Sequence, residues 1–250
     1  MQRYFINEPF VNQKRIEITG DDYHHIVRVM RMKMGDEILI VTNDGKVATA
    51  SIEQVTDVSV EASVTSWEEE SKELPVQIVI ASGLPKGDKL EWIIQKGTEL
   101  GASEFVPFIA GRSIVKWEEK KAVKKLERWN KIAKEAAEQS HRQILPSVHA
   151  PLSFKELIQL GEQCERKIVA YEEVAKYGEQ SNFAEALNKT EPGNKVLLVF
   201  GPEGGMTEKE ANELHAHGFI LCGLGPRILR TETAPLYALA AISYHFELMR

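Results

Sequence analysis

Short runs of alternating apolar and polar residues fill the first part of the chain. Residues 47–52 are such a run, residues 37–41 form a mostly apolar one, and Asn43-Asp44-Gly45 lies between the two. Asp-Gly at this place predicts a β-hairpin, because glycine adopts a positive φ without steric cost. The alternation continues over residues 55–62, and a short helix is expected to begin at Asp21 or Asp22. Residues 1–72 are therefore predicted to form a small β-barrel.

The pattern changes after a highly charged segment, residues 67–74, which stops at Pro75. Charge followed by proline is typical of a linker. From residue 76 the apolar runs are almost continuous, as expected for strands buried on both faces. The sequence thus predicts two domains, residues 1–72 and residues 73–250.

Apolar runs and amphipathic stretches alternate through the second region. Helix starts are indicated by three pairs with capping-box spacing, Asp88/Glu91, Ser153/Glu156 and Thr207/Glu210. This alternation predicts an α/β fold with a mostly parallel sheet and helices on both faces. The expected strands are 76–81, 104–108, 167–171, 195–200 and 219–222, and the longest expected helices are 117–140 and 235–249.

The net charge of −6 argues at first against a nucleic-acid partner, but the charge is unevenly distributed. Residues 1–72 hold 8 Lys/Arg and 13 Asp/Glu, which gives −5, whereas residues 112–142 hold 10 and 5, which gives +5. Local basic clusters attract a phosphate backbone. The alternative is the solvated face of one helix, made of Lys120, Lys121, Lys124, Lys125, Lys131 and Lys134.

Several classes of protein are disfavoured by what the sequence lacks. No apolar stretch has the length of a membrane span, and the N-terminus has no secretory pattern. Cys164 and Cys222 form neither a metal motif nor a disulfide framework, so we expect a cytoplasmic protein without a metal site. There is no dinucleotide fingerprint, P-loop or nucleophile elbow.

Two unusual loops follow predicted strands, and ligands of open parallel sheets bind at the carboxyl ends of strands. Residues 201–205 read Gly-Pro-Glu-Gly-Gly, which allows a sharp turn close to a ligand, although a plain strand-to-helix turn is the alternative. Residues 224–235 include the run Arg230-Thr231-Glu232-Thr233. The hydroxyls of Thr231 and Thr233 are candidate helix caps, but that role leaves Arg230 and Glu232 unexplained.

At these loops the chain resembles the SPOUT class of methyltransferases. It is most similar to the bacterial family that methylates N3 of a uridine in small-subunit ribosomal RNA. The similar stretches span nearly the whole chain, and the two loops are the most specific of them: residues 3–5, 24–31, 86–89, 95–101, 138–142, 201–205 and 224–234.

The resemblance implies a PUA-like β-barrel that holds RNA, followed by an α/β SPOUT domain with a deep trefoil knot. Knots are nearly absent from proteins, so composition alone would not predict one. The resemblance also implies S-adenosylmethionine as cofactor, a homodimer with the site at its interface, and the assembled small subunit as substrate.

For the chemistry, Arg230 is the best candidate to stabilise a uracil anion. Glu203 or Glu232 would orient Arg230 or accept the N3 proton; pairing with arginine to shape the loop is the alternative. The cofactor is expected at Gly201, Pro202, Glu203, Gly204, Gly205, Leu224, Gly225, Ile228, Leu229, Thr231, Thr233 and Ala234. RNA contacts are expected from Arg3, His24, His25, Arg28, Arg31, Arg112 and Arg142, with one of the two histidines packed in the barrel instead.

Three other functions are weighed against this hypothesis. A SPOUT enzyme that methylates another RNA target, such as a ribose 2′-hydroxyl, would use a similar arginine. A non-catalytic RNA-binding assembly factor would not need a pocket for a methyl donor. A small-molecule enzyme on a flavodoxin-like sheet leaves the barrel and the basic segment unexplained.

Overall fold

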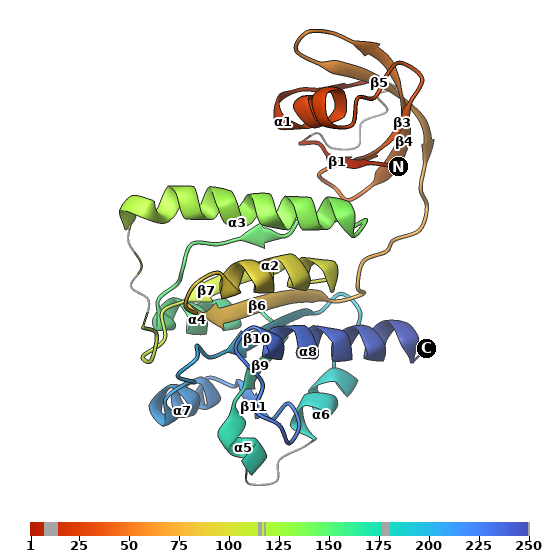
Figure 1. Ribbon diagram of the computed structural model, residues 1–250. Coiled ribbons are helices and arrows are strands. Elements are labelled where there is room, and N and C mark those ends of the chain that lie inside the picture. Colours follow the sequence, from red (N-terminus) through yellow and green to blue (C-terminus); the bar gives the residue numbers. More distant parts are fainter. Residues whose placement is uncertain (8–14, 115–116, 118, 177–180, 250) are drawn as a thin grey trace. The chain divides into compact units, whose positions relative to one another are not determined.

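The computed structural model describes residues 1–7, 15–114, 117, 119–176 and 181–249, apart from the side chains of residues 119–121, 175 and 176. The predicted contributions of Lys120 and Lys121 lie outside this description. The chain divides into two compact units: residues 1–73 with 137–145, and residues 74–136 with 146–250 (Figure 1). The division into two independent domains, residues 1–72 and residues 73–250, stays a prediction.

The first unit is a five-stranded sheet in the order β1-β3-β4-β5-β2, in which β1 is parallel to β3 and the other pairs are antiparallel. Ile26, Ile38, Ile40 and Val60 lie in its apolar core. Its elements are β1 (Arg3–Phe5), β2 (Arg15–Ile18), α1 (Gly20–His24), a π-helical turn η1 (His25–Val29), β3 (Glu37–Val41), β4 (Val47–Val55) and β5 (Val60–Trp67).

The predicted hairpin is confirmed as β3 and β4, and Gly45 adopts a φ of 78° between them. The helix near Asp21 is confirmed as α1, which continues into η1. The predicted β-barrel takes the form of a half-barrel, in which β1 and β2 lie at the two edges of the sheet among the described residues.

The charged segment predicted as a linker is exposed at residues 69–72 but is anchored at Glu73. The Glu73 carboxylate accepts hydrogen bonds from Nε of Arg142 at 2.7 and 2.9 Å and from the backbone amides of Gln143 and Ile144. Arg3 in turn donates to the backbone carbonyl of Arg142 at 2.8 Å. Arg3, Glu73 and Arg142, called the buried arginine cluster below, therefore fix residues 142–144 within the first unit.

The second unit contains a six-stranded sheet in the order β11-β9-β10-β6-β7-β8, and all of its pairings are parallel. This confirms the predicted parallel α/β sheet. Its strands are β6 (Gln77–Gly83), β7 (Glu104–Phe108), β8 (Ser147–Val148), β9 (Arg166–Ala170), β10 (Lys195–Phe200) and β11 (Ile220–Cys222). Its helices are α2 (Lys89–Glu99), α3 (Glu119–Gln139), α4 (Phe154–Gly161), α5 (Glu172–Lys176), α6 (Asn182–Asn188), α7 (Glu208–Ala216), α8 (Thr233–Ser243) and a π-helical turn η2 (Tyr244–Leu248).

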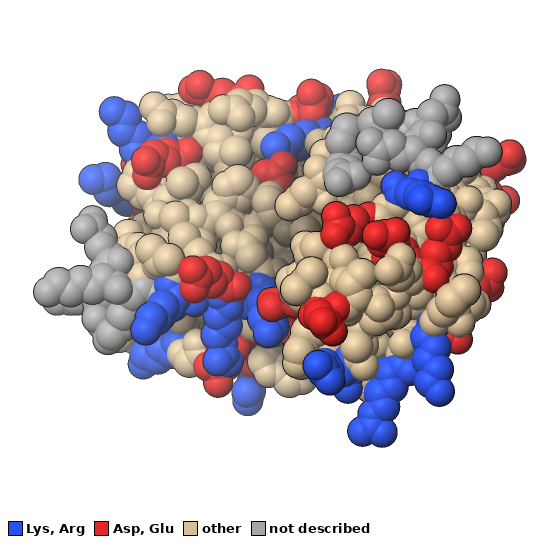
Figure 2. Space-filling model, turned by 90° about the horizontal axis from the view of Figure 1, so that it is seen from above, with Lys and Arg blue, Asp and Glu red and all other residues tan. Residues whose placement is uncertain are grey.

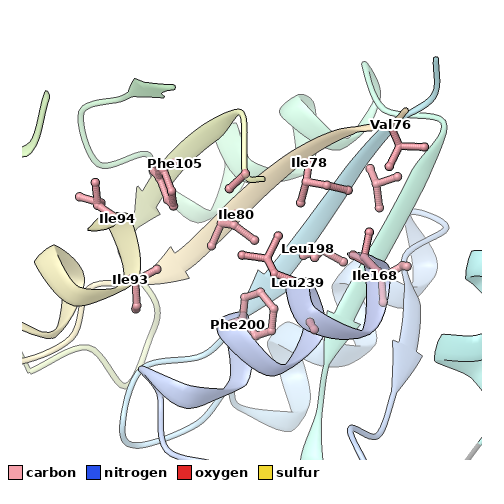
Figure 3. Packing of buried hydrophobic residues seen from close by; sticks show 14 of the residues in the cluster. Val76, Ile78, Ile80, Ile93, Ile94, Phe105, Ile168, Leu198, Phe200 and Leu239 are labelled. Atoms are coloured by element: carbon pink, nitrogen blue, oxygen red, sulfur yellow. The ribbon is translucent and has the colours of Figure 1, made fainter. Parts of the chain in front are cut away.

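Two apolar clusters cover the two faces of this sheet. On one face Ile78, Ile80 and Leu198 pack against Ile93 of α2 and Leu239 of α8 (Figure 3). On the other face, side chains of the same strands pack against α4 and α7. The continuous apolar strands follow from this double burial, as the sequence predicted.

Two of the three predicted capping boxes are present in the structure. The capping boxes at Ser153 and Thr207 are both formed. The box predicted at Asp88 is wrong, because Asp88 makes no side-chain cap and Glu91 pairs with Arg128 instead. The short elements β8, α5 and α6 were not predicted. The knot implied by the resemblance stays a prediction.

Candidate functional site

A cavity of about 1000 Å³ lies at the carboxyl ends of β9, β10 and β11. Its walls come from residues 170–174, 200–206 and 221–231, together with side chains of α2 and α7. The strand order explains the place: β10 inserts between β6 and β9, and open α/β sheets bind ligands at such switch points. Both loops selected from the sequence therefore meet at one site.

The loop after β10 forms a tight turn that ends in a backbone conformation favoured by glycine. Gly205 has a φ of 67°, and its amide donates to the carbonyl of Pro202 at 2.8 Å. Gly83, the last residue of β6, makes room for this loop, because a Cβ there would lie 2.6 Å from Cδ of Pro202. The loop is thus held against the end of β6 by close backbone packing.

The loop after β11 reaches across the cavity and ends at α8. Ile228 is 78% exposed within it, and Arg230 is exposed as well. The proposed caps at Thr231 and Thr233 are not formed, since Glu232 occupies the N-cap position without a side-chain cap. The cavity is lined by all the predicted cofactor positions except Thr233: Gly201, Pro202, Glu203, Gly204, Gly205, Leu224, Gly225, Ile228, Leu229, Thr231 and Ala234.

The two predicted catalytic carboxylates meet at a lysine that sequence reasoning missed. Nζ of Lys89 lies 2.9 Å from Oε1 of Glu203 and 3.6 Å from Oε2 of Glu232. Arg230 lines the cavity but makes no side-chain hydrogen bond or ion pair with any described residue. The expected pairing of a carboxylate with Arg230 is therefore replaced by pairing with Lys89.

The protonation of this cluster follows from its contacts. The hydrogen bond to Glu203 is the main cause that raises the pKa of Lys89. Burial acts to raise the pKa of Glu203, but hydrogen bonds from Lys89 and from the Lys86 amide outweigh it and leave that pKa lowered. Both groups are thus charged near neutral pH, and Glu203 is a weak proton acceptor.

Arg112, predicted to contact RNA, lies at the cavity. Its Nη1 donates to the carbonyl of Gly204 at 3.0 Å, and the neighbouring Gly111 amide donates to Glu210, the glutamate of the α7 capping box. Sequence analysis did not select the remaining wall, which includes Tyr171 and Glu172 after β9 and Asn212 of α7, because neither stretch carries an unusual motif.

The other residues predicted to bind RNA divide by burial. His24, Arg28 and Arg31 are exposed on α1, η1 and the turn that follows. His25 is half-buried, and its Nδ1 lies 3.0 Å from the Tyr4 hydroxyl, so one histidine packs inward as expected. Arg3 and Arg142 are only 2% and 5% exposed, and a contact of their guanidinium groups with RNA is contradicted by that burial.

The basic helix α3 carries mixed charge on its solvent side. Lys124, Arg128 and Lys131 are exposed there together with Glu127, and Arg128 makes a two-fold ion pair with Glu91 at 2.7 Å. On the face shown in Figure 2, groups of basic side chains are likewise bordered by acidic ones. A solvated helix face explains this pattern without a ligand.

Within the described residues, no group of histidine, cysteine, aspartate and glutamate side chains has the arrangement of a metal site. No helix in the described part of the chain is long and apolar enough to cross a membrane.

Comparison with known proteins bears directly on the two units. Residues 72–243 match the model of a family described as an RNA methyltransferase domain. Residues 18–65 match the model of an RNA methyltransferase PUA domain. The first match covers the cavity and both of its loops.

Individual relatives agree with these matches. The chain is 54% identical to the "Ribosomal RNA small subunit methyltransferase E" of Bacillus subtilis, over 100% of this chain and 99% of that protein. A crystal structure of the enzyme of the same name from Neisseria gonorrhoeae, bound to S-adenosyl methionine, aligns with a TM-score of 0.83 at 28% identity over 97% of both chains. A putative methyltransferase from Legionella pneumophila, in complex with the cofactor SAM, aligns with a TM-score of 0.82 at 29% identity over 96% of both.

Proposed function

This chain belongs to the ribosomal RNA small subunit methyltransferase E family, and from that premise we propose its reaction. The protein transfers a methyl group from S-adenosylmethionine to N3 of a uridine in the RNA of the small ribosomal subunit. The observation that carries the proposal is a cavity at the ends of β9, β10 and β11 with an exposed Arg230 at its wall.

The residues present fit this cofactor. Glycines at 201, 204 and 205 bring backbone groups to the cavity surface, and Phe200, Leu224 and Ile228 offer apolar contacts for an adenine. Carboxylates and arginines on the same wall suit the ammonium and carboxylate of an amino acid. When bound, S-adenosylmethionine supplies an activated methyl group, and the protein must orient the acceptor.

The acceptor nitrogen of uracil bears a proton, so the protein must stabilise negative charge on the base. Arg230 suits this role, because its guanidinium is exposed at the cavity and makes no ion pair within the described residues. A fixed guanidinium near a uracil carbonyl oxygen lowers the energy of the anion. Glu203 is disfavoured as the base by its lowered pKa, which leaves Glu232 or solvent.

The half-barrel supports RNA binding through its exposed basic residues, His24, Arg28 and Arg31. Charge reversal of Arg28 and Arg31 together should weaken subunit binding roughly tenfold at moderate salt, because each lost phosphate contact reduces counterion release. The affinity of the protein for labelled small subunits measures this effect. Arg15→Glu is the control, because Arg15 is exposed but is not among the residues predicted to contact RNA. An unchanged affinity would remove these arginines from the RNA interface.

We extend the proposal to a homodimer, a knotted catalytic domain and a cytoplasmic location. Support for the dimer comes from large apolar side chains exposed on α8 and η2: Tyr237 at 43%, Tyr244 at 57% and Leu248 at 72%. Contiguous exposed apolar groups of this kind mark interaction surfaces. Sedimentation of the purified protein tests the dimer.

The central experiment is a methyl-transfer assay with labelled S-adenosylmethionine. Intact small subunits are compared with naked ribosomal RNA, and the methylated nucleosides are identified by mass spectrometry. We expect 3-methyluridine, mainly from assembled subunits. A methyl group on ribose would show that the acceptor is the ribose hydroxyl rather than uracil N3. No methyl transfer together with no cofactor binding would favour a non-catalytic RNA-binding protein.

A further inference from the structure

Lys89 joins the two loops of the cavity through their carboxylates. It is the first residue of α2, while Glu203 belongs to the loop after β10 and Glu232 to the loop before α8. Its ammonium is 2.9 Å from one carboxylate and 3.6 Å from the other. One cation therefore faces two anions that come from different parts of the chain.

Glu232 has an unusual need for a cation. Its Oε2 is buried and has no hydrogen-bond partner, and the ammonium of Lys89 at 3.6 Å is the charge that compensates it. A buried carboxylate oxygen without a donor costs free energy. If Lys89 were lost, this oxygen and Glu203 would both attract another cation.

Arg230 is one cation of the cavity wall that is close to Glu232 along the chain. It lies two residues before Glu232 and lines the same cavity as Glu203 and Lys89. Guanidinium groups bind carboxylates in a forked geometry that is stronger than a single ammonium contact. Arg230 nevertheless makes no ion pair within the described residues, and both carboxylates face Lys89 instead.

We propose that Lys89 is a positioning residue: by occupying Glu203 and Glu232 it keeps the guanidinium of Arg230 available for the uracil base. The inference rests on the proposed function, since it assigns the purpose for which Arg230 is kept available. Lys89 remains protonated in this role, because its hydrogen bond to Glu203 raises its pKa.

The availability of Arg230 can be measured without the reaction. Phenylglyoxal modifies accessible guanidinium groups, and peptide mass spectrometry reports the rate at each arginine of the cofactor-free protein. In Lys89→Met the rate at Arg230 should fall roughly fivefold to tenfold, as for formation of an ion pair of modest strength. Arg227, exposed in the same loop, serves as the internal reference.

Two further variants separate charge compensation from structural damage. Lys89→Arg retains the cation and should keep Arg230 reactive. The triple variant Lys89→Met, Glu203→Gln, Glu232→Gln removes the cation and both anions, so Arg230 should regain the wild-type rate. A purely structural role of Lys89 would leave the triple variant as slow as Lys89→Met, and that result would overturn the inference.

Kinetic measurements with assembled subunits then test whether the availability of Arg230 affects kcat. In Lys89→Met, kcat should fall about 100-fold while the dissociation constant for S-adenosylmethionine changes little, because the loss acts through a charge-stabilising donor. A fall in kcat with an unchanged modification rate at Arg230 would mean that Lys89 acts on the substrate directly, which also overturns the inference. If the wild-type protein transfers no methyl group, the proposed function fails, whereas the modification rates still test Lys89.

Discussion

Arg3 and Arg142 of the first unit differ from Arg230 of the second in burial and in partners, although the sequence presented all three alike. In the first unit, Arg3 and Arg142 are almost fully buried: Arg142 pairs with Glu73, and Arg3 donates to the carbonyl of Arg142. In the second unit, Arg230 is exposed at a cavity and has no ion-pair partner among the described residues. Each belongs to a stretch that resembles the same family.

A motif arginine therefore serves folding or chemistry according to its burial and its partner. A buried guanidinium must be paired, because an uncompensated charge in the interior is costly. A guanidinium left unpaired at a cavity is instead available to a ligand. Substitutions of the buried arginines and of the exposed one test this difference.

Arg142→Ala should have the largest effect, on stability rather than on chemistry. It leaves the buried Glu73 carboxylate without its main cation, and breaking a buried pair typically costs about 3–5 kcal/mol. Urea unfolding measures the loss, and the exposed Arg28→Ala is the control that should stay within about 0.5 kcal/mol of wild type. A loss below about 1 kcal/mol for Arg142→Ala would show that burial does not set its role.

Arg230→Ala should show the reverse behaviour. Turnover with small subunits should fall about 100-fold to 1000-fold, the effect of removing one charge-stabilising donor. The free energy of unfolding and the affinity for S-adenosylmethionine should stay near wild type, because the side chain makes no ion pair within the described residues. Full activity of this variant would end the assignment of Arg230 to the chemistry.

Gly83→Ala tests how closely the cavity loop depends on β6. The new Cβ would lie 2.6 Å from Cδ and 2.7 Å from N of Pro202, so the loop must move. We expect a loss of about 1–3 kcal/mol in stability and roughly tenfold weaker cofactor binding by calorimetry. Gly97→Ala is the matched control: its Cβ meets the Phe105 ring at 2.7 Å, and it should reduce stability without changing cofactor affinity.

Much of the second unit could be predicted from the sequence, because each signal there is local. The apolar strands, for example β10 at residues 195–200, and the capping boxes at Ser153 and Thr207 depend only on neighbouring residues. The place of the cavity followed from the rule that parallel strands present their carboxyl ends at one edge.

The failures concern contacts between distant residues. Glu91 had the spacing of a cap for Asp88, but Arg128 of another helix competes for its carboxylate. Arg142 was assigned to RNA because its partner, Glu73, is 69 residues away in the sequence. Lys89 was missed for the same reason, since Glu203 and Glu232 reach it only in the folded chain.

Glu104 offers an intermediate case, a half-exposed ionic cluster on β7. Its Oε1 is 2.7 Å from Nζ of Lys195 and its Oε2 is 3.3 Å from Nε2 of His149. The hydrogen bond with His149 is the largest cause that lowers the pKa of Glu104 to about 2, with further lowering by Lys195 and opposition from burial. If burial decides the role of a charge, this cluster should stabilise the fold less than the buried arginine cluster does.

The sign of its pH dependence follows from that lowered pKa. A carboxylate whose folded-state pKa lies below its unfolded value stabilises the protein above about pH 4.5, and the contribution is lost as the pH falls toward 2. Glu104→Gln should therefore lower stability at pH 7 by about 1 kcal/mol, after allowance for solvent screening, and should flatten the decline of stability below pH 4.5. Glu99→Gln, at the more exposed pair with Lys96, should change neither quantity measurably. Urea unfolding at pH 3 and pH 7 compares the three proteins, and equal effects of the two substitutions would mean that burial does not grade these ion pairs.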